Sequence, residues 1–351
     1  VPSLTTKVEL LFGGRCKRPP QGVHFAPGRL VVLGEHLDHQ LGRVLATPLR
    51  EGVACAWGVR PDSRVVVWSM NARQKDSFHQ DRLFKSGRSW ADLARGAYAH
   101  VAADGRRMPG IDLMVLGDLQ IGQGLASSAA YLVVLLRSIY DAVGVYRSRF
   151  ELAQDVPAIE QEWLGVRCGS MDPYVVASAK SAQVLHVDCR ELDHETLQLP
   201  EGHAFVGVES GIQRRLTDTP YNARRAELES ALATLQREQP ALRGICDLGM
   251  DVLPALATQL DETALRRVRH VVTETARVGE AAAALESGDK QALGSLMNDG
   301  HRSLVEDFES SLPEIDRLAE EVRQRPEVLG ARLNGAGWGG QLAVLTTIDS
   351  D

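Results

Sequence analysis

The chain has 351 residues, of which 44% are hydrophobic and 24% charged, and its formal net charge is −7. Such a composition is typical of a globular protein. The mixing of acidic and basic residues argues against nucleic acid as a partner, because a phosphate backbone requires a clustered basic face. No apolar run approaches the roughly 20 residues of a membrane span, so we expect no membrane partner, and the length predicts about two domains.

The five cysteines are widely spaced and form no CxxC pair. Neither a zinc site nor a dithiol redox motif is therefore predicted. Thiols outside disulfides favour a reducing compartment over secretion, and the first residues, VPSLTTKVELLFGG, lack the apolar core of a signal peptide. We expect a cytoplasmic protein.

The first half of the chain mixes strands and helices. In GRLVVLGEHLDHQLG, residues 28–42, an apolar strand end is followed at once by a dense polar cluster. Polar side chains gathered in this way are typical of a ligand site. Further along, residues 53–60 and 63–70 predict consecutive strands, 89–105 an amphipathic helix, and 110–119 another strand.

A glycine loop, GQGLASS, follows the last of these strands. Glycines let backbone N–H groups approach an anion, and the helix predicted from about Ala129 adds a positive dipole end. Ser127 and Ser128 offer hydroxyls to phosphate or magnesium, although capping of the helix is an equal alternative. The loop is not a P-loop, which requires lysine, and Ser127 stands where a dinucleotide fingerprint has glycine.

Two carboxylates come next in the chain. Glu160 lies in a helix predicted over 158–165, and Asp172 precedes a helix predicted from Pro173. Carboxylates near a phosphate loop supply the oxygen ligands that magnesium prefers. The alternatives are a solvated helix face for Glu160 and a helix N-cap for Asp172.

The second half is richer in helices. Strands are predicted over 181–189 and 191–200, and long helices over 222–239, 264–288 and 290–308. Residues 331–348 then form a strand, a glycine-rich loop and a strand. Such a loop predicts close backbone approach to a ligand, or else a tight hairpin. The order of elements favours two α+β lobes.

Several motifs now occur in a familiar order: APGRLVVLGEHLDH, GQGLASSAA and GARLNGAGWGG, with GVRCGSMDPYVVASAKSAQVLHVDCREL, PYNARRAELE and LMNDGHRSLVEDFESSLPEIDRL between and around them. Through them the chain resembles the galactokinase branch of the GHMP small-molecule kinases over essentially its whole length. The resemblance implies an α+β fold with a ribosomal-S5-like lobe over 1–195 and a ferredoxin-like lobe over 196–351. It also implies an ATP-dependent kinase, with Mg²⁺, acting on the anomeric hydroxyl of galactose or a related sugar. Its partners would be a small-molecule sugar and ATP, and we expect a monomer or weak homodimer.

The resemblance further implies the site residues. Asp172 would accept or orient the proton of the sugar hydroxyl. Arg29 beside it would keep that carboxylate ionised and stabilise charge on the transferred group. Magnesium is expected at Ser128 and Glu160. The ATP residues are expected to be Gly122, Gly124, Leu125, Ser127, Ser128 and Ala129, with Gly335, Gly337 and Gly339 in the third motif. The sugar residues are expected to be Glu35, His36, Asp38, His39, Gly169 and Tyr221.

Some positions depart from the family pattern. Val31 replaces the strand asparagine and Asn334 replaces a threonine of the third motif. In the sugar motif, Leu37 and His39 replace threonine and tyrosine. Another sugar, such as arabinose, a uronic acid or an amino sugar, therefore stays an alternative to galactose. A non-catalytic sugar sensor on the same fold is a further alternative, disfavoured by the presence of the predicted catalytic pair.

Overall fold

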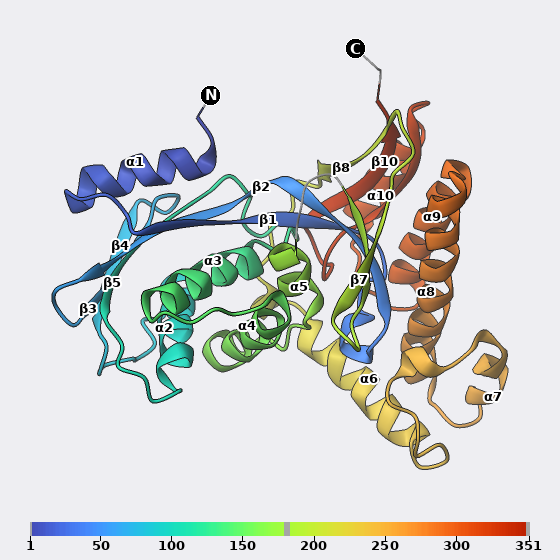
Figure 1. Ribbon diagram of the computed structural model, residues 1–351. Helices are drawn as coiled ribbons and strands as arrows, with labels where there is room; N and C mark the ends of the chain where they lie inside the picture. The colour runs from blue at the N-terminus through green and yellow to red at the C-terminus, as the bar shows by residue number, and fades with distance from the viewer. Residues whose placement is uncertain (1, 179–182, 349–351) are drawn as a thin grey trace. The chain divides into compact units, whose positions relative to one another are not determined.

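The computed structural model describes residues 2–178 and 183–348, and its elements group into two compact units (Figure 1). Unit 1 comprises the described residues of Val1–Gly28, Leu49–Gln120 and Ala126–Ala179. Unit 2 comprises those of Arg29–Pro48, Ile121–Leu125 and Lys180–Asp351. Since both units combine segments from different parts of the chain, the lobe boundaries 1–195 and 196–351 stay a prediction.

Unit 1 contains helices α1 (Leu4–Cys16), α2 (Ser89–Ala102), α3 (Ser127–Ala142), α4 (Arg149–Leu164) and α5 (Met171–Ser178). Its strands are β3 (Arg64–Ser69), β4 (Gln74–His79), β5 (Gly110–Gly117) and parts of β1 (Gly22–Leu33) and β2 (Arg43–Arg60). Antiparallel pairs join β4 to β3 and β5 to β2, and β3 pairs with β5 in parallel. A parallel pair requires a crossover connection, and α2 lies in it.

The core of unit 1 lies between its strands and helices. On one side α1 packs against β5, where Val8 and Phe12 join Ala54, Ala56 and Met114 in a buried cluster. Helices α2, α3, α4 and α5 pack against one another and lie on the other side of the strands (Figure 1). The second group carries Ser128 and Glu160, the residues predicted to hold magnesium.

Unit 2 contains β6 (Val184–Asp188), β7 (Asp193–Leu197), β8 (His203–Glu209), β9 (Val328–Leu333) and β10 (Gln341–Thr347). The start of β2 pairs with β6 and β6 with β7, whereas β10 lies between β8 and β9 in an antiparallel sheet. Its helices are α6 (Tyr221–Leu235), α7 (Leu253–Leu256), α8 (Glu262–Ser287), α9 (Lys290–Glu306) and α10 (Pro313–Arg323). Helices α9 and α10 pack on β9, and α8 packs on α9.

Most predicted elements are present with shifted ends. The three long helical stretches correspond to α6, α8 and α9, and the apolar face predicted for 89–105 is buried in α2 at Leu93, Ala97 and Val101. Two predicted helix starts are wrong by two residues, since α3 begins at Ser127 and α5 at Met171. Helices α1, α7 and α10 and strands β4 and β8 were not predicted. The first residues of the strand predicted over 181–189 lie outside the described ranges.

Two expectations about the chain as a whole can be compared with the structure. Within residues 2–178 and 183–348, no helix is both long and apolar enough to cross a membrane. All five cysteines fall within these ranges, and none of them forms a disulfide bond.

Candidate functional site

Three segments that are distant in the sequence come together in unit 2. They are the end of β1 (Arg29–Leu33), the glycine-loop residues Gly122–Leu125, and the loop Asn334–Gly340 between β9 and β10. The Arg29 backbone N–H donates to the Leu125 carbonyl (3.2 Å), and its guanidinium donates to the Gly124 carbonyl. Strand β1 and the glycine loop are thus joined at the predicted catalytic arginine, which is buried.

The third glycine motif contacts both of the other segments. Asn334 Oδ1 accepts from the Val31 N–H (2.8 Å), and Asn334 Nδ2 donates to the Gly124 carbonyl (2.9 Å). The two loops are also in direct backbone contact, because a Cβ at Gly124 would lie 2.9 Å from the Asn334 carbonyl oxygen. Gly124 and Gly335 have φ values of 74° and 77°, which glycine adopts readily. Glycine at these two positions therefore allows the backbones of the two loops to contact each other.

A polar cluster adjoins these loops within unit 2. The Gly335 N–H donates to Glu35 Oε1 (2.5 Å), so this carboxylate also holds the third motif. The His36 ring stacks on Phe308 with centroids 4.1 Å apart, and lies 6.0 Å from the ring of Tyr221. Burial lowers the pKa of His36 well below its usual value, and the imidazole is neutral at physiological pH. Three predicted sugar residues thus meet from two distant segments.

Two further predicted sugar residues, Asp38 and His39, lie in a 3₁₀ turn, Asp38–Gln40, a few residues after the end of β1. Asp38 and His39 are half-buried, and the His39 ring lies 6.4 Å from that of His36. Burial lowers the pKa of His39, although the Asp38 carboxylate acts in the opposite direction. Gln40 Oε1 accepts from the Ile245 N–H (3.3 Å), which anchors the end of this turn to a distant segment of unit 2.

Buried residues that were not predicted support the cluster. His270 Nε2 lies 3.1 Å from the Glu35 carbonyl oxygen, and Nδ1 lies 2.9 Å from Ser303 Oγ. Burial lowers the pKa of His270 to about 4, so its ring is neutral. Because a carbonyl oxygen can only accept, the proton lies on Nε2. A histidine in a long helix gave no sequence signal for this role.

A buried ion pair holds the glycine just before Glu35. Glu274 and Arg332 are both fully buried, and Arg332 Nη1 donates to Glu274 Oε1 at 2.7 Å. The same oxygen accepts from the Gly34 N–H (2.8 Å), and Arg277 donates to the other oxygen. Burial would raise the pKa of Glu274, but the two guanidiniums hold it well below its usual value. The carboxylate is therefore ionised and fixes the backbone at the strand end.

In unit 1, helix α3 begins at the glycine loop. Its first residue is Ser127, and the preceding Ala126, with φ of 58°, makes no side-chain capping bond. Neither Ser127 nor Ser128 is the N-cap, so the capping alternative is wrong. The first turn of α3 thus has N–H groups that no capping side chain satisfies, an arrangement that favours an anion such as phosphate.

The predicted magnesium residues meet in unit 1. Ser128 Oγ donates to Glu160, which is only 6% exposed, so the solvated-face alternative is wrong. Burial raises the pKa of Glu160, and the charge of Asp172 raises it further, while hydrogen bonds from Ser128 and Cys168 lower it. Asp172 is half-buried in the first turn of α5 and is not its N-cap, because the helix begins at Met171.

The chemistry of this group fits a magnesium ion. Mg²⁺ prefers oxygen ligands and usually keeps several from water and substrate phosphate. Ser128 and Glu160 supply a hydroxyl and a carboxylate in contact, and Asp172 lies near enough to affect the Glu160 charge. Within the described part of the chain, no three or more His, Cys, Asp or Glu side chains form a metal-binding group. A cation here would therefore depend on ligands from the nucleotide and water.

The remaining predicted residues occupy loops or helix starts. Gly169 precedes α5, in a segment outside any helix or strand, and Ala129 lies in the first turn of α3. Gly337 and Gly339 lie in the loop after β9. Two backbone bonds anchor that loop, from the Trp338 N–H to Ser310 (2.6 Å) and from the Gly340 N–H to Ile212 (2.8 Å).

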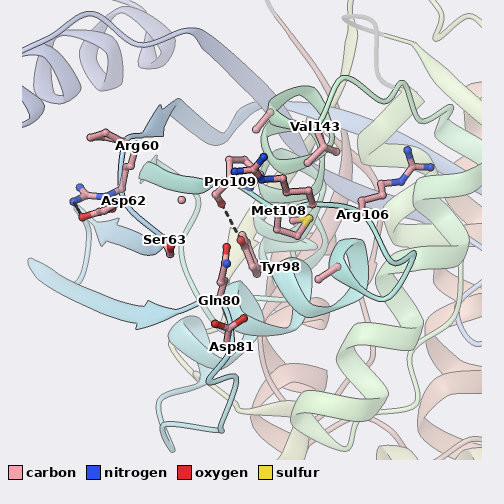
Figure 2. A pocket seen from close by; sticks show the side chains of 15 residues that line it. Arg60, Asp62, Ser63, Gln80, Asp81, Tyr98, Arg106, Met108, Pro109 and Val143 are labelled. Atoms are coloured by element: carbon pink, nitrogen blue, oxygen red, sulfur yellow. Dashed lines mark hydrogen bonds and ion pairs between the residues drawn. The ribbon is translucent and has the colours of Figure 1, made fainter.

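A pocket of about 970 Å³ in unit 1 contains none of the predicted site residues (Figure 2). The Arg60 guanidinium on its wall pairs with Asp62 (2.8 Å) and with Asp112 (2.7 Å). Tyr98 OH donates to the Pro109 carbonyl (2.8 Å), the bond drawn as a dashed line near the centre of Figure 2. Since these polar groups already have partners within the protein, we do not place the site here.

Family models match three parts of the chain. Residues 92–180 match the GHMP kinases N terminal domain and residues 281–350 the GHMP kinases C terminal model. Residues 11–59 match the galactokinase galactose-binding signature. The chain is also 35% identical over 321 residues to the galactokinase of Roseiflexus sp. (strain RS-1), which is 92% of this chain and 82% of that protein.

Solved structures are similar as well. The crystal structure of Lactococcus lactis galactokinase complexed with galactose matches with a TM-score of 0.90 and 27% identity, over 98% of this chain and 90% of that one. Methanococcus jannaschii mevalonate kinase matches with a TM-score of 0.64 and 13% identity, over 94% and 92% of the two chains. The second likeness shows the fold alone. Together these findings confirm the predicted α+β fold class.

Proposed function

Because the chain belongs to the galactokinase family of GHMP kinases, and is thus a phosphotransferase with an alcohol group as acceptor, we propose that it phosphorylates the anomeric hydroxyl of galactose with ATP. The observation that carries the proposal is the cluster of Glu35, His36 and Tyr221 beside the glycine loops of unit 2. The likeness to a galactokinase solved with galactose supports this choice of sugar.

Sugar recognition in this proposal depends on polar complementarity. Carboxylates at Glu35 and Asp38 would accept from sugar hydroxyls, with the neutral His36 ring beside them. An inverted or missing hydroxyl would leave a buried polar group unpaired, at a cost of about 1–3 kcal/mol. Discrimination between related sugars would follow from this cost.

Phosphoryl transfer would use Asp172 and Arg29. Asp172 would accept the proton of the anomeric hydroxyl or orient that hydroxyl for attack. Arg29, whose guanidinium is fixed on the Gly124 carbonyl, would stabilise negative charge on the transferred group. Positioning and electrostatic stabilisation account for most of the catalysis in reactions of this class.

The nucleotide would place its phosphates at the glycine loop and the uncapped start of α3. Ser128 and Glu160 would hold Mg²⁺, which neutralises charge on the phosphate oxygens when bound. Composition supports two further proposals, a cytoplasmic location and no nucleic-acid or membrane partner. We also propose a monomeric or weakly dimeric state.

A second candidate is a kinase of the same family for another sugar. The observation in its favour is His39, which lies half-buried in the cluster where the family pattern has tyrosine. A changed side chain at this position alters both the volume and the hydrogen-bonding groups that face a sugar. Arabinose, uronic acids and amino sugars are the acceptors to compare.

The test is magnesium-dependent ATP consumption with a panel containing galactose, glucose, arabinose, galacturonic acid and galactosamine, with ³¹P NMR to locate the new phosphate. We expect galactose to give the highest kcat/KM and a 1-phosphate product. A higher value for another sugar would assign the second candidate. Saturable sugar binding without turnover of any sugar would contradict the kinase and indicate a sensor.

A further inference from the structure

Asn334 is a fully buried side chain whose amide uses both of its polar ends. Its Oδ1 accepts from the Val31 N–H of β1 (2.8 Å), and its Nδ2 donates to the Gly124 carbonyl (2.9 Å). Its backbone N–H donates to the Gln341 carbonyl (3.0 Å), which fixes the residue, just past the end of β9, opposite the start of β10. One side chain thus connects the segments of all three motifs.

The Gly124 carbonyl is the point at which these contacts converge. It accepts from the Asn334 amide and also from the Arg29 guanidinium. Two donors on one carbonyl fix the direction of the peptide plane. The glycine loop and the guanidinium therefore depend on the same oxygen, and a turn of this peptide would displace both.

Both residues of this bond are departures from the motifs that the sequence resemblance leads us to expect. Asparagine is expected at 31 and threonine at 334, whereas this chain has Val31 and Asn334. The structure shows that these two departures are hydrogen-bonded to each other, through the Val31 backbone and the Asn334 side chain. The bond crosses from β1 to the third motif in unit 2.

We propose that Asn334 is a positioning residue for phosphoryl transfer, which holds the Gly124 carbonyl so that the glycine loop and Arg29 keep their working geometry. The inference rests on the proposed function, because it assigns Asn334 to the nucleotide side of that reaction. We assign Asn334 no direct role in sugar binding, because the two polar atoms of its amide bond to Val31 and Gly124, neither of which is a predicted sugar residue.

The test uses Asn334→Asp, which keeps the acceptor for Val31 but replaces the donor to Gly124 by a carboxylate oxygen. We expect kcat to fall about tenfold or more, because small displacements of a phosphate loop are costly. The dissociation constant for a non-hydrolysable ATP analogue, measured by calorimetry, should rise about fivefold, with the sugar KM changed by less than about twofold.

Asn298→Asp is the matched control. Asn298 Oδ1 accepts from the Ala331 N–H (3.0 Å) of β9, the strand that leads into Asn334, but it bonds to neither Val31 nor the Gly124 carbonyl. This variant should keep kcat and analogue affinity within about twofold of wild type. Equal losses in the two variants would show a merely structural effect and overturn the proposal.

If Asn334→Asp does not fold, Asn334→Thr takes its place. Its single, shorter hydroxyl cannot reproduce both bonds of the amide, and the same pattern is expected at about threefold loss. Folded Asn334 variants with unchanged kcat and analogue affinity would overturn the inference. Turnover by the wild-type protein tests the proposed function separately. If the wild type shows no turnover, the dissociation constant of the ATP analogue, measured by calorimetry, still decides whether Asn334 positions the glycine loop.

Discussion

The predicted chemical groups of unit 1 and unit 2 are held in different ways. In unit 1, Ser128 projects from α3 and Glu160 from α4, and a hydrogen bond joins the two side chains. In unit 2, Glu35, Glu274 and Asn334 bond to backbone N–H or carbonyl groups of other motifs. Changes in unit 1 should therefore affect mainly chemistry, whereas changes in unit 2 should affect the local fold and function together.

The sharpest form of this contrast is Asp172→Asn in unit 1. The substitution removes the group that accepts or orients the hydroxyl proton, so kcat should fall by about 10³-fold, within the usual range for such groups. Binding of an ATP analogue and thermal stability should stay unchanged. Steady-state kinetics, calorimetry and thermal unfolding provide the three measurements.

Asp141→Asn is the control, since Asp141 is an exposed aspartate on α3 that pairs with His24 (2.7 Å). An exposed pair contributes little, about 1 kcal/mol at most. Undiminished turnover in Asp172→Asn would remove Asp172 from the mechanism.

The largest stability effect is expected in unit 2, for Glu274→Gln. The variant leaves Arg332 buried without its counter-charge, which should cost about 3–5 kcal/mol. The folded-state pKa of Glu274 is lowered, so its contribution is present above the unfolded value of 4.5 and is lost as pH falls through the folded value. The stability difference from wild type, measured by urea unfolding, should accordingly shrink in strong acid.

Glu280→Gln, an exposed position on the same helix, serves as the control and should change stability by less than about 0.5 kcal/mol. If Glu274→Gln and this control are equally stable, the buried pair does not support unit 2 in the way described.

Glu160→Gln in unit 1 should weaken magnesium binding without lowering the stability of the fold. Burial raises the pKa of Glu160 in the folded protein, so the charged carboxylate is disfavoured there. The free energy of unfolding of the wild type therefore falls as pH rises above 4.5, the pKa of this group in the unfolded chain. The neutral variant should be as stable as wild type or more so at pH 7. Half-saturation with Mg²⁺ should nevertheless need about tenfold more metal, since one carboxylate ligand is lost.

Glu162→Gln, exposed on the same helix, should leave both quantities as in wild type. A magnesium requirement equal in the two variants would place the metal elsewhere.

An effect that appears only in acid is expected for His301 in unit 2, whose Nδ1 accepts from the Leu333 N–H (3.2 Å). Burial lowers the pKa of His301 from 6.5 to about 3. Between these values the unfolded chain binds the extra proton, so stability falls as pH falls, by about 1.4 kcal/mol per pH unit for this group.

His301→Asn retains an acceptor but cannot titrate, and it should reduce that slope in unfolding experiments between about pH 6 and 4. His79→Asn, at an exposed position, should not reduce it. A slope unchanged in both variants would contradict the neutral buried state of His301.

Residue types and spacing were sufficient to predict some features. Helices α6, α8 and α9 follow from a periodic apolar pattern, because that pattern is local. The starts of α3 and α5 were misplaced by two residues, because serine and proline at these points are equally compatible with a cap or a first turn. Helix α1 was missed, since it buries only Val8 and Phe12 and thus carries little apolar pattern.

The sequence by itself determined the kinase family and the segments that carry its motifs, because motif residues and their order are read directly from the chain. Only the tertiary structure decided which partners those residues use. Glu274 and His270 look unremarkable in sequence, and Asn334 stands out only as a departure from the expected motif, yet each bonds to a backbone group of a distant segment. Burial and long-range hydrogen bonding depend on packing among elements far apart in the chain, and no local pattern contains that information.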